Sequence, residues 1–237
     1  IGGGPGGSTL ASSLAKRGRR SLVLEREKFP RFHIGESLLP CSRGVLTELG
    51  IDDELDRRFI RKYGARFLCS TTGRTNTYHF ADAYEAAFDY AYQVPRAEFD
   101  HVLLEHAKKL GADVREEWEV ADVIFDGSRA VGVRARNMHE SSNIVEFHAP
   151  VIADATGRDT LLATRTRRKA NIPRLDKTAF FSHFRNTVRQ EGVEEGNIQI
   201  VVFEHGWFWF IPFRGDLTSV GAVCSSEWIK QKKKGES

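Results

Sequence analysis

The sequence predicts an α/β protein that opens with a βαβ unit and continues into a β-rich region interleaved with that unit. A glycine-rich turn, Gly2-x-Gly4-x-x-Gly7, leads into an amphipathic helix, and an apolar strand follows at residues 21–26. Further along, one strongly amphipathic helix is followed by many alternating strand patterns. The 237 residues are enough to bury one large core or two interleaved ones.

The glycines of the opening turn have separate physical tasks. Gly2 permits the tight turn, Gly4 lets the backbone approach a pyrophosphate, and Gly7 lets the helix pack closely. The helix N-terminus offers unpaired N–H groups to the anion. A plain glycine turn would explain the glycines alone, but Glu25 stands about 20 residues downstream at a strand end, where an acidic side chain takes a ribose hydroxyl. The unit therefore predicts a dinucleotide site containing Gly2, Gly4, Pro5, Gly7, Ser8, Glu25 and Arg26.

Each end of the sequence cuts off an expected element of secondary structure. A Rossmann turn needs a strand before it, and only Ile1 precedes Gly2. At the other end the chain stops just as a helix begins at residues 227–229. We therefore interpret the sequence as an internal fragment that lacks a C-terminal region.

Composition narrows the class of protein. Hydrophobic residues at 41% and charged residues at 28% are typical of a soluble globular protein. The net charge of +3 comes from dispersed residues, so we expect no nucleic-acid partner. No apolar stretch approaches ~18 residues, so we expect no membrane partner. Cys41, Cys69 and Cys224 lack metal-ligand spacing, which predicts reduced thiols, no metal site and a cytoplasmic location.

The remaining elements follow from local periodicity. Helical spacing predicts helices at residues 43–49 and 52–58, and one from residue 96 to Gly111. Alternation predicts strands at residues 65–70, 77–80, 88–94, 113–117, 120–125, 131–136, 144–147, 180–188, 198–203, 207–212 and 219–224. The apolar run 151–155 predicts a fully buried strand that ends in the turn 156–158.

Two further motifs connect the glycine turn to a cofactor. Val94-Pro95-Arg96-Ala97-Glu98-Phe99-Asp100 starts a helix, and Asp154-Ala155-Thr156-Gly157-Arg158 closes a strand. Singly, they would be explained as a helix-capping arginine and an ordinary turn. Together with the glycine turn, they resemble the FAD-dependent monooxygenase-like flavoproteins, in which such an arginine lies near the flavin dinucleotide and such a turn lies beside its phosphates. The resemblance implies FAD as the cofactor, with Arg96, Asp154 and Gly157 among its binding residues.

Three more segments are similar to those of the flavin-dependent halogenases. The segment 33–40 (HIGESLLP) resembles a Gly-Glu-Ser-Leu-Leu-Pro segment that borders the flavin, which implies that Glu36 and Ser37 lie at the cofactor. The segment 206–212 (GWFWFIP) matches the family's Trp-x-Trp-x-Ile-Pro signature, and Lys62 stands where the family places its active-site lysine. The resemblance covers nearly the whole chain.

The resemblance implies a fold and a domain division. The fold class is α/β, with an FAD-binding Rossmann-like domain of the glutathione-reductase type and an interleaved β-sheet substrate domain. We expect the FAD-binding half to comprise residues 1–70 and 95–165, and the substrate-side β-sheet region to comprise residues 71–94 and 170–226.

The implied function is flavin-dependent halogenation in natural-product biosynthesis. Reduced FAD from a separate flavin reductase, oxygen, and chloride or bromide would halogenate an electron-rich substrate. A phenol- or pyrrole-like small molecule or a carrier-protein-tethered aromatic group fits this chemistry. Two alternatives stay open: an FAD-dependent monooxygenase or geranylgeranyl-reductase-like oxidoreductase, and a non-catalytic or truncated FAD-binding protein.

Physical logic suggests what the catalytic residues Lys62, Trp207 and Trp209 would do. Hypohalous acid reacts indiscriminately in water, so a lysine amine could carry it to the substrate, and desolvation would favour the neutral amine that this needs. Adjacent tryptophans could wall off the flavin side. The structural alternatives are a surface lysine, tryptophans that merely pack in a sheet, and a Glu36 that only starts a helix. The histidines expected to be structural are His33, His79, His183 and His205.

Overall fold

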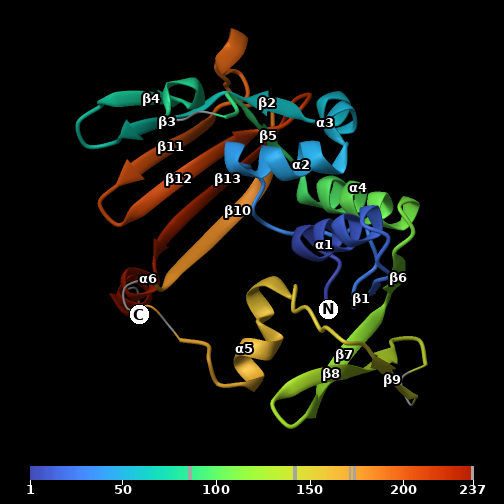
Figure 1. Cartoon of the computed structure of the whole chain (residues 1–237). Coiled ribbons are helices and arrows are strands. Elements are labelled where there is room, and N and C mark those ends of the chain that lie inside the picture. Colours follow the sequence, from blue (N-terminus) through green and yellow to red (C-terminus); the bar gives the residue numbers. More distant parts are fainter. Residues whose placement is uncertain (85–86, 141–142, 171, 173–174, 236–237) are drawn as a thin grey trace. The chain divides into compact units, whose positions relative to one another are not determined.

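The computed structural model describes residues 1–84, 87–140, 143–170, 172 and 175–235, with side chains through residue 230. The chain divides into two compact units (Figure 1). Unit 1 combines residues 1–34 with 96–170, and unit 2 combines residues 35–95 with 171–237.

Unit 1 begins with two helices and two strands: α1 (Pro5–Lys16), β1 (Leu22–Glu25), α4 (Arg96–Lys109) and β6 (Asp113–Glu116). The strands β1 and β6 pair in parallel, and α4 supplies the crossover between parallel strands that such a pair requires. Ala11 of α1 and Ala107 of α4 are buried with Val23 of β1, so small side chains fill the space among these elements. The predicted helix after the glycine turn and the strand that follows it are confirmed, and the parallel partner of that strand is β6.

An antiparallel sheet completes unit 1 with strands β7 (Trp118–Asp126), β8 (Arg129–Asn137) and β9 (Ile144–His148), followed by the short helix α5 (Leu161–Arg165). Val123 and Val133 of this sheet form a buried cluster with Leu24 of β1. The apolar inner face of the sheet therefore covers the strands of the βαβ unit.

The buried strand predicted at residues 151–155 is wrong. This segment has no regular secondary structure, and Val151 at its start is 77% exposed. Within the described residues its main-chain hydrogen bonds connect it to Ile1. The Ala155 N–H donates to the Ile1 carbonyl at 2.8 Å, and the Ile1 amino group donates to the Ala153 carbonyl at 2.8 Å. No strand of the described residues pairs along this segment, so no ladder is present there.

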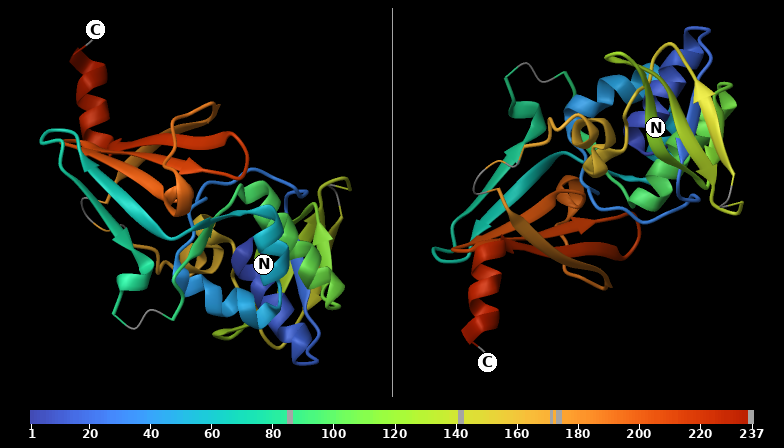
Figure 2. Two further views of the ribbon diagram at one scale, coloured as in Figure 1. Left: turned by 90° about the horizontal axis from the view of Figure 1, so that it is seen from above. Right: turned by 90° about the horizontal axis from the view of Figure 1, so that it is seen from below.

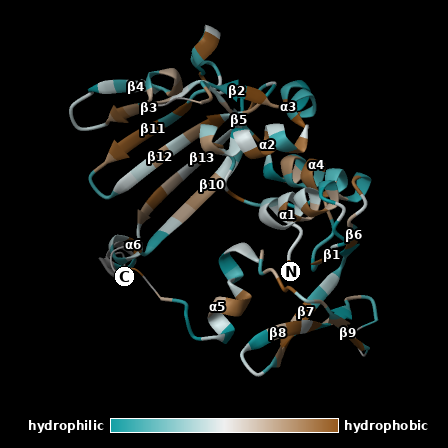
Figure 3. Ribbon diagram, viewed as in Figure 1, coloured by the Kyte–Doolittle hydropathy of each residue, from teal (hydrophilic) through white to brown (hydrophobic). Residues whose placement is uncertain are grey.

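Unit 2 contains a six-stranded sheet in the order β10-β13-β12-β11-β3-β4 (Figures 1 and 2). Its strands are β3 (Gly64–Cys69), β4 (Thr75–His79), β10 (Lys177–Arg185), β11 (Ile198–Phe203), β12 (Gly206–Pro212) and β13 (Leu217–Ser225). All neighbours are antiparallel except β3 and β11, which pair in parallel. Hydrophobic residues follow one another along β11, as Figure 3 shows.

The parallel pairing of β3 with β11 also explains why residues 35–70 belong to unit 2. The sequence placed residues 35–70 with the FAD-binding half, whereas they group with unit 2. Ala65 of β3 lies opposite Ile198 of β11, so a long-range pairing ties this early segment to a late strand. Local periodicity carries no signal for a partner so distant in sequence.

A small second sheet of unit 2 positions Lys62. Its strands are β2 (Ile60–Lys62) and β5 (Ala91–Gln93), which pair antiparallel. The opposite edge of β5 binds the segment 36–38, because the Leu38 N–H donates to the Tyr92 carbonyl and the Val94 N–H donates to the Glu36 carbonyl. Three-residue β2 was missed by the sequence analysis, since it is too short to show alternation.

Three helices complete unit 2: α2 (Arg43–Leu49), α3 (Asp52–Arg58) and α6 (Ser226–Gly235). The first two match the predicted helices. None of the helices in the described ranges has the length and apolar character that crossing a bilayer requires.

Candidate functional site

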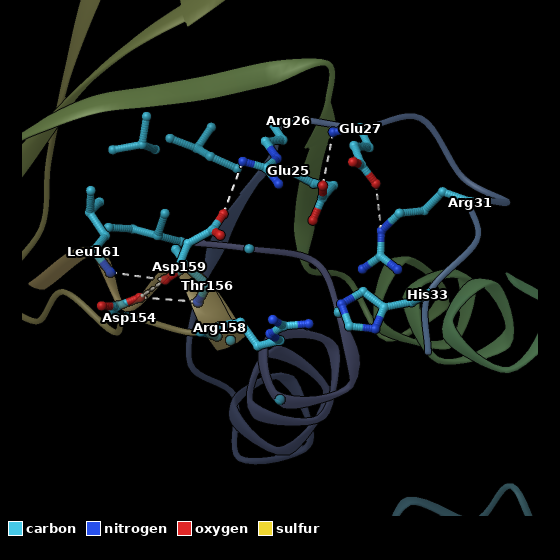
Figure 4. A pocket seen from close by; sticks show the side chains of 18 of the residues that line it. Glu25, Arg26, Glu27, Arg31, His33, Asp154, Thr156, Arg158, Asp159 and Leu161 are labelled. Carbon is cyan, nitrogen blue, oxygen red and sulfur yellow. Dashed lines mark hydrogen bonds and ion pairs between the residues drawn. The ribbon is translucent and has the colours of Figure 1, made fainter. Parts of the chain in front are cut away.

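Unit 1 contains a cavity of about 680 Å³ at the carboxyl end of β1 and the N-terminus of α1 (Figure 4). Ligands of open α/β sheets bind in this position, outside the carboxyl ends of the strands. The predicted cofactor residues that line the cavity are Gly2, Gly4, Pro5, Glu25, Arg26, Arg96, Asp154 and Gly157. Eight of the twelve predicted cofactor residues therefore line this cavity.

The glycines form a cradle that side chains would fill. A Cβ on Gly7 would lie 1.9 Å from the Gly2 carbonyl oxygen, and one on Gly2, whose φ is +95°, would lie 2.6 Å from the Ala155 oxygen. A Cβ on Gly4 meets only the Arg31 Nη2 atom, at 3.3 Å, so this glycine faces the cavity. The turn thus keeps the first-turn N–H groups of α1 open to a bound anion, which fits the diphosphate of a dinucleotide.

Gly7 and Ser8 shape the cradle without lining the cavity. Ser8 is fully buried, and its hydroxyl donates to the Gly3 carbonyl oxygen at 2.7 Å. The hydroxyl thereby fixes the turn from behind. Proline at the first position of α1 removes an N–H that the helix would not use.

Glu25 ends β1 and lies buried at the bottom of the cavity wall. One carboxylate oxygen accepts the Gly3 N–H at 2.6 Å, and the other accepts the Glu27 N–H at 2.8 Å. The carboxylate therefore ties β1 to the glycine turn. Each oxygen retains a second lone pair for a ribose hydroxyl.

Asp154 organises the opposite side of the cavity (Figure 4). It accepts the Thr156 N–H at 3.0 Å, the Thr156 hydroxyl at 2.6 Å and the Leu162 N–H at 2.7 Å. Burial would raise the pKa of this carboxyl, but the hydrogen bonds outweigh burial, and its pKa lies below the ordinary value. Asp159 in the same turn pairs with Arg26 at 2.9 Å.

Arg96 belongs to a network that the sequence analysis missed. Its guanidinium donates to both oxygens of Asp100, at 2.7 and 2.9 Å, and to the Ile34 carbonyl. Arg31 donates to the same carboxylate at 3.0 Å and also lines the cavity. Periodicity gives no signal for Arg31, because it lies in an irregular loop. Its position just after the carboxyl end of a parallel strand is the signal that could have found it.

Lys62 lies in unit 2, where the structure contradicts the surface-lysine alternative. The residue is 2% exposed, and its ammonium donates to the Ser37 hydroxyl and the Leu38 carbonyl, both at 2.9 Å. The Phe80 ring lies 5.0 Å from Nζ. Burial lowers the pKa of Lys62 to about 8. The amine therefore releases its proton far more readily than an ordinary lysine does, although it is mainly protonated below about pH 8.

Glu36 lies in the same extended segment as Ser37, so the helix-start alternative is wrong. The residue is 1% exposed, and its Oε1 lies 2.9 Å from His183 Nε2 on β10. Oε2 finds no hydrogen-bond partner in the part of the chain that the structure describes. The His183 ring packs edge-on against Phe213. The structure thus gives His183, expected to be structural, a buried acidic partner.

Trp207 and Trp209 share one face of β12, as residues two apart on a strand do. Trp209 is buried, its indole N–H donates to the Ser219 hydroxyl at 3.1 Å, and a Cβ on Gly221 would come within 2.3 Å of its ring. Trp207 is half-buried. The alternative that a tryptophan only packs in the sheet therefore fits Trp209 better than Trp207.

The sequence matches the FAD binding domain family over residues 1–203. It is 35% identical over 250 residues to the 1H-pyrrole-2-carbonyl-[peptidyl-carrier protein] chlorinase of Pseudomonas fluorescens, covering 96% of this chain and 55% of that protein. The solved structure of the myxobacterial chondrochloren halogenase CndH shares 44% identity with a TM-score of 0.88, over 99% of this chain and 54% of that one.

A flavoprotein/dehydrogenase of Cytophaga hutchinsonii is similar too, with 32% identity and a TM-score of 0.87 over 98% of this chain and 56% of that structure. The chain thus spans about half the length of the relatives that it matches. The glycine cradle, the acid at the end of β1 and the family match lead to one conclusion: this chain belongs to the FAD-binding-domain family, and its sequence and fold are similar to those of flavin-dependent halogenases.

Proposed function

We propose that the complete protein is a flavin-dependent halogenase that uses reduced FAD, oxygen, and chloride or bromide. The observation that carries the proposal is the buried amine of Lys62, whose hydrogen-bond acceptors among the described residues are a hydroxyl and a carbonyl and not a carboxylate. A structural lysine is normally exposed or ion-paired. A neutral, desolvated amine is instead suited to bind or accept an electrophilic halogen.

Some residues of the proposed cofactor site would contact FAD, and others would only shape the cavity. Gly4, the N-terminus of α1 and Arg96 would hold the diphosphate, and Glu25 would hold the ribose, since these groups line the cavity. Bound in reduced form, FAD supplies the oxygen activation from which hypohalous acid arises. Glu36 and Ser37 are proposed as neighbours of the flavin on the basis of the family resemblance.

Substrate and partner follow from the relatives. The chlorinase of Pseudomonas fluorescens is named for a pyrrole group bound to a peptidyl carrier protein. We propose a phenol- or pyrrole-like substrate, free or carrier-tethered, and a separate flavin reductase, because the sequence carries a single G-x-G-x-x-G turn. The proposed site of action is the cytoplasm, where reduced flavin and reduced thiols persist.

The test is the effect of Lys62 variants on oxygen consumption and on halogenation, measured separately in the complete protein. Lys62→Ala should still bind FAD and convert oxygen to hydrogen peroxide, yet give no halogenated product. Lys62→Arg should not restore halogenation, because a guanidinium stays protonated. Lys177→Ala, at an exposed position of β10, is the matched control. Substantial halogenation by Lys62→Ala would overturn the assignment.

The tryptophans are proposed as a wall and not as chemical participants. In the same assay, Trp207→Ala should give some hydroxylated product or more peroxide, because substrate would reach the flavin directly. Trp209→Ala should in addition lower stability by about 3–5 kcal/mol, since it empties a buried site. Product analysis by mass spectrometry with a thermal melt separates the two effects.

A second candidate is a flavin-dependent oxidoreductase that transfers no halogen. Its support is the similarity to a flavoprotein/dehydrogenase over 98% of the chain. Turnover of a substrate that is independent of chloride and bromide, and that survives Lys62→Ala, would favour this candidate.

A further inference from the structure

Both hydrogen-bond acceptors of the Lys62 amine belong to one short extended segment, residues 36–38. The amine donates to the Ser37 hydroxyl and to the Leu38 carbonyl, both at 2.9 Å. The main chain of the segment follows β5, because the Leu38 N–H donates to the Tyr92 carbonyl at 3.0 Å. The position of segment 36–38 therefore decides where the amine is held.

The Glu36 side chain gives this segment a second attachment. Glu36 is 1% exposed, and its Oε1 lies 2.9 Å from Nε2 of His183 on β10. Oε2 has no hydrogen-bond partner among the described residues, so within them the histidine provides the single hydrogen bond of this buried carboxylate. A buried carboxylate without a partner is unfavourable. An apolar residue in place of His183 should therefore drive the Glu36 side chain, and the segment with it, out of position.

The same histidine connects the segment to the sheet that carries the tryptophans. His183 lies two residues along β10 from Phe181, so the two side chains share one face of the sheet. The centres of the Phe181 and Trp209 rings are 6.1 Å apart. The contact between Glu36 and His183 therefore attaches the acceptors of Lys62 to the face of the sheet on which Trp209 lies.

Ionisable residues near Lys62 bind one another and not its amine. Arg61, the preceding residue of β2, donates to Asp56 at 2.8 and 2.6 Å. His79, at the end of β4, lies 3.8 Å from Glu194. Burial is what lowers the pKa of Lys62, so water that reached the amine would raise this pKa.

We propose that His183 is a positioning residue for Lys62: its contact with Glu36 holds segment 36–38 in place, and this segment holds the amine and keeps water from it. The proposal rests on the proposed function of Lys62. It makes the proposed halogenation depend on β10, a strand that lies far from Lys62 in the sequence.

The test measures Lys62 directly, by competitive acetylation of the complete protein between about pH 6 and about pH 11. Mass spectrometry quantifies the acetylated peptide that contains Lys62. In the parent protein the amine should titrate near pH 8 and should react slowly, because it is buried. His183→Leu should raise the apparent pKa of Lys62 by about one unit or more and should increase the reactivity of its neutral form, because water and reagent both reach it.

Two variants of similar polarity separate positioning from stability. His183→Gln keeps an N–H donor near the place of Nε2 and should restore the parent titration. His183→Asn is one methylene shorter, so its amide should not reach Glu36 and Lys62 should titrate as in His183→Leu. If His183→Leu does not fold, His183→Asn decides the question. His139→Leu removes an exposed histidine that lies 3.0 Å from Glu117, and this matched control should leave the titration of Lys62 unchanged.

Halogenation should follow the labelling. The amount of product formed per oxygen consumed should reach its maximum at a higher pH in His183→Leu, because fewer molecules carry a neutral amine at a given pH. An unchanged Lys62 titration in His183→Leu and His183→Asn would overturn the proposal. Activity lost equally at every pH with that titration unchanged would mean a structural role and would overturn it too. The labelling does not require turnover, so halogenation that survives Lys62→Ala would instead contradict the proposed function.

Discussion

At the scale of single residues, the charge state of Lys62 is the most consequential feature. Burial lowers the pKa of its amine to about 8 from 10.5. Between these values the unfolded chain holds a proton that the folded chain lacks, so the free energy of unfolding rises as the pH rises through this window. Below about pH 8, the folded protein carries the full cost of a buried ammonium.

Lys62→Met removes this titration and should reveal it. The stability of the parent relative to the variant should increase by about 2–3 kcal/mol between pH 7 and pH 10. Urea unfolding of both proteins across this range measures the difference, and other titrating groups cancel because both proteins share them. A parallel pH dependence of the two proteins would contradict the burial of the amine.

Sequence reasoning reached some of these residues and not others. Glu25 was predictable, because its spacing from the glycine turn is fixed by the length of one helix and one strand. The burial of Lys62 was not, since it depends on β5 bringing the segment 36–38 beside β2. The partnership of Glu36 with His183 joins residues far apart in sequence, and no local pattern announces it.

At the scale of elements, the glycines of the turn have different roles: one allows ligand binding, and another allows folding. Gly4→Val places a side chain in the cavity, and its Cβ meets only the Arg31 Nη2 atom, at 3.3 Å. Gly7→Ala places its Cβ 1.9 Å from a backbone oxygen, which has no room to move. The two glycines of one motif therefore differ in what they protect.

Gly4→Val should abolish FAD retention and leave the melting temperature of the protein without ligand within a few degrees of the parent. Gly7→Ala should lower that melting temperature strongly, because the turn and the start of α1 must separate. Flavin absorbance after gel filtration and a thermal melt without ligand are the measurements. Normal FAD affinity in Gly4→Val would show that the diphosphate does not bind at this turn.

The elements themselves were mostly predictable, with an instructive exception. Helices α2 and α3 have their predicted bounds, because helical spacing and a glycine stop are local signals. The segment 151–155 has a strand composition, yet it pairs only with Ile1 among the described residues. Composition sets the propensity of a segment, and a neighbouring strand decides whether a ladder forms.

At the scale of the whole molecule, each unit is built from separate stretches of the chain. The parallel pairing of β3 with β11 joins residues 64–69 to residues 198–203. The sheet of unit 2 cannot form until the later strand exists, and such non-local pairing slows folding. The sequence predicted that two regions interleave, but it did not predict that β3 pairs with β11.

A chain shortened to residues 1–170 should aggregate, because β3 and β4 remain without the strands that pair with them. A chain shortened to residues 1–225 keeps all six strands and should stay monodisperse. Light scattering after gel filtration compares the two. A monodisperse 1–170 chain would show that the hairpin of β3 and β4 is stable by itself.

The interleaved connectivity also determines how this protein can be recombined. A crossover at any single position between residues 35 and 170 would divide both units, so a hybrid made from one such breakpoint would combine incomplete parts of each. Breakpoints between residues 34 and 35, 95 and 96, and 170 and 171 would together exchange one unit as a set. Library design and the tracing of ancestral exchange should therefore treat the two discontinuous stretches of each unit as one inherited module.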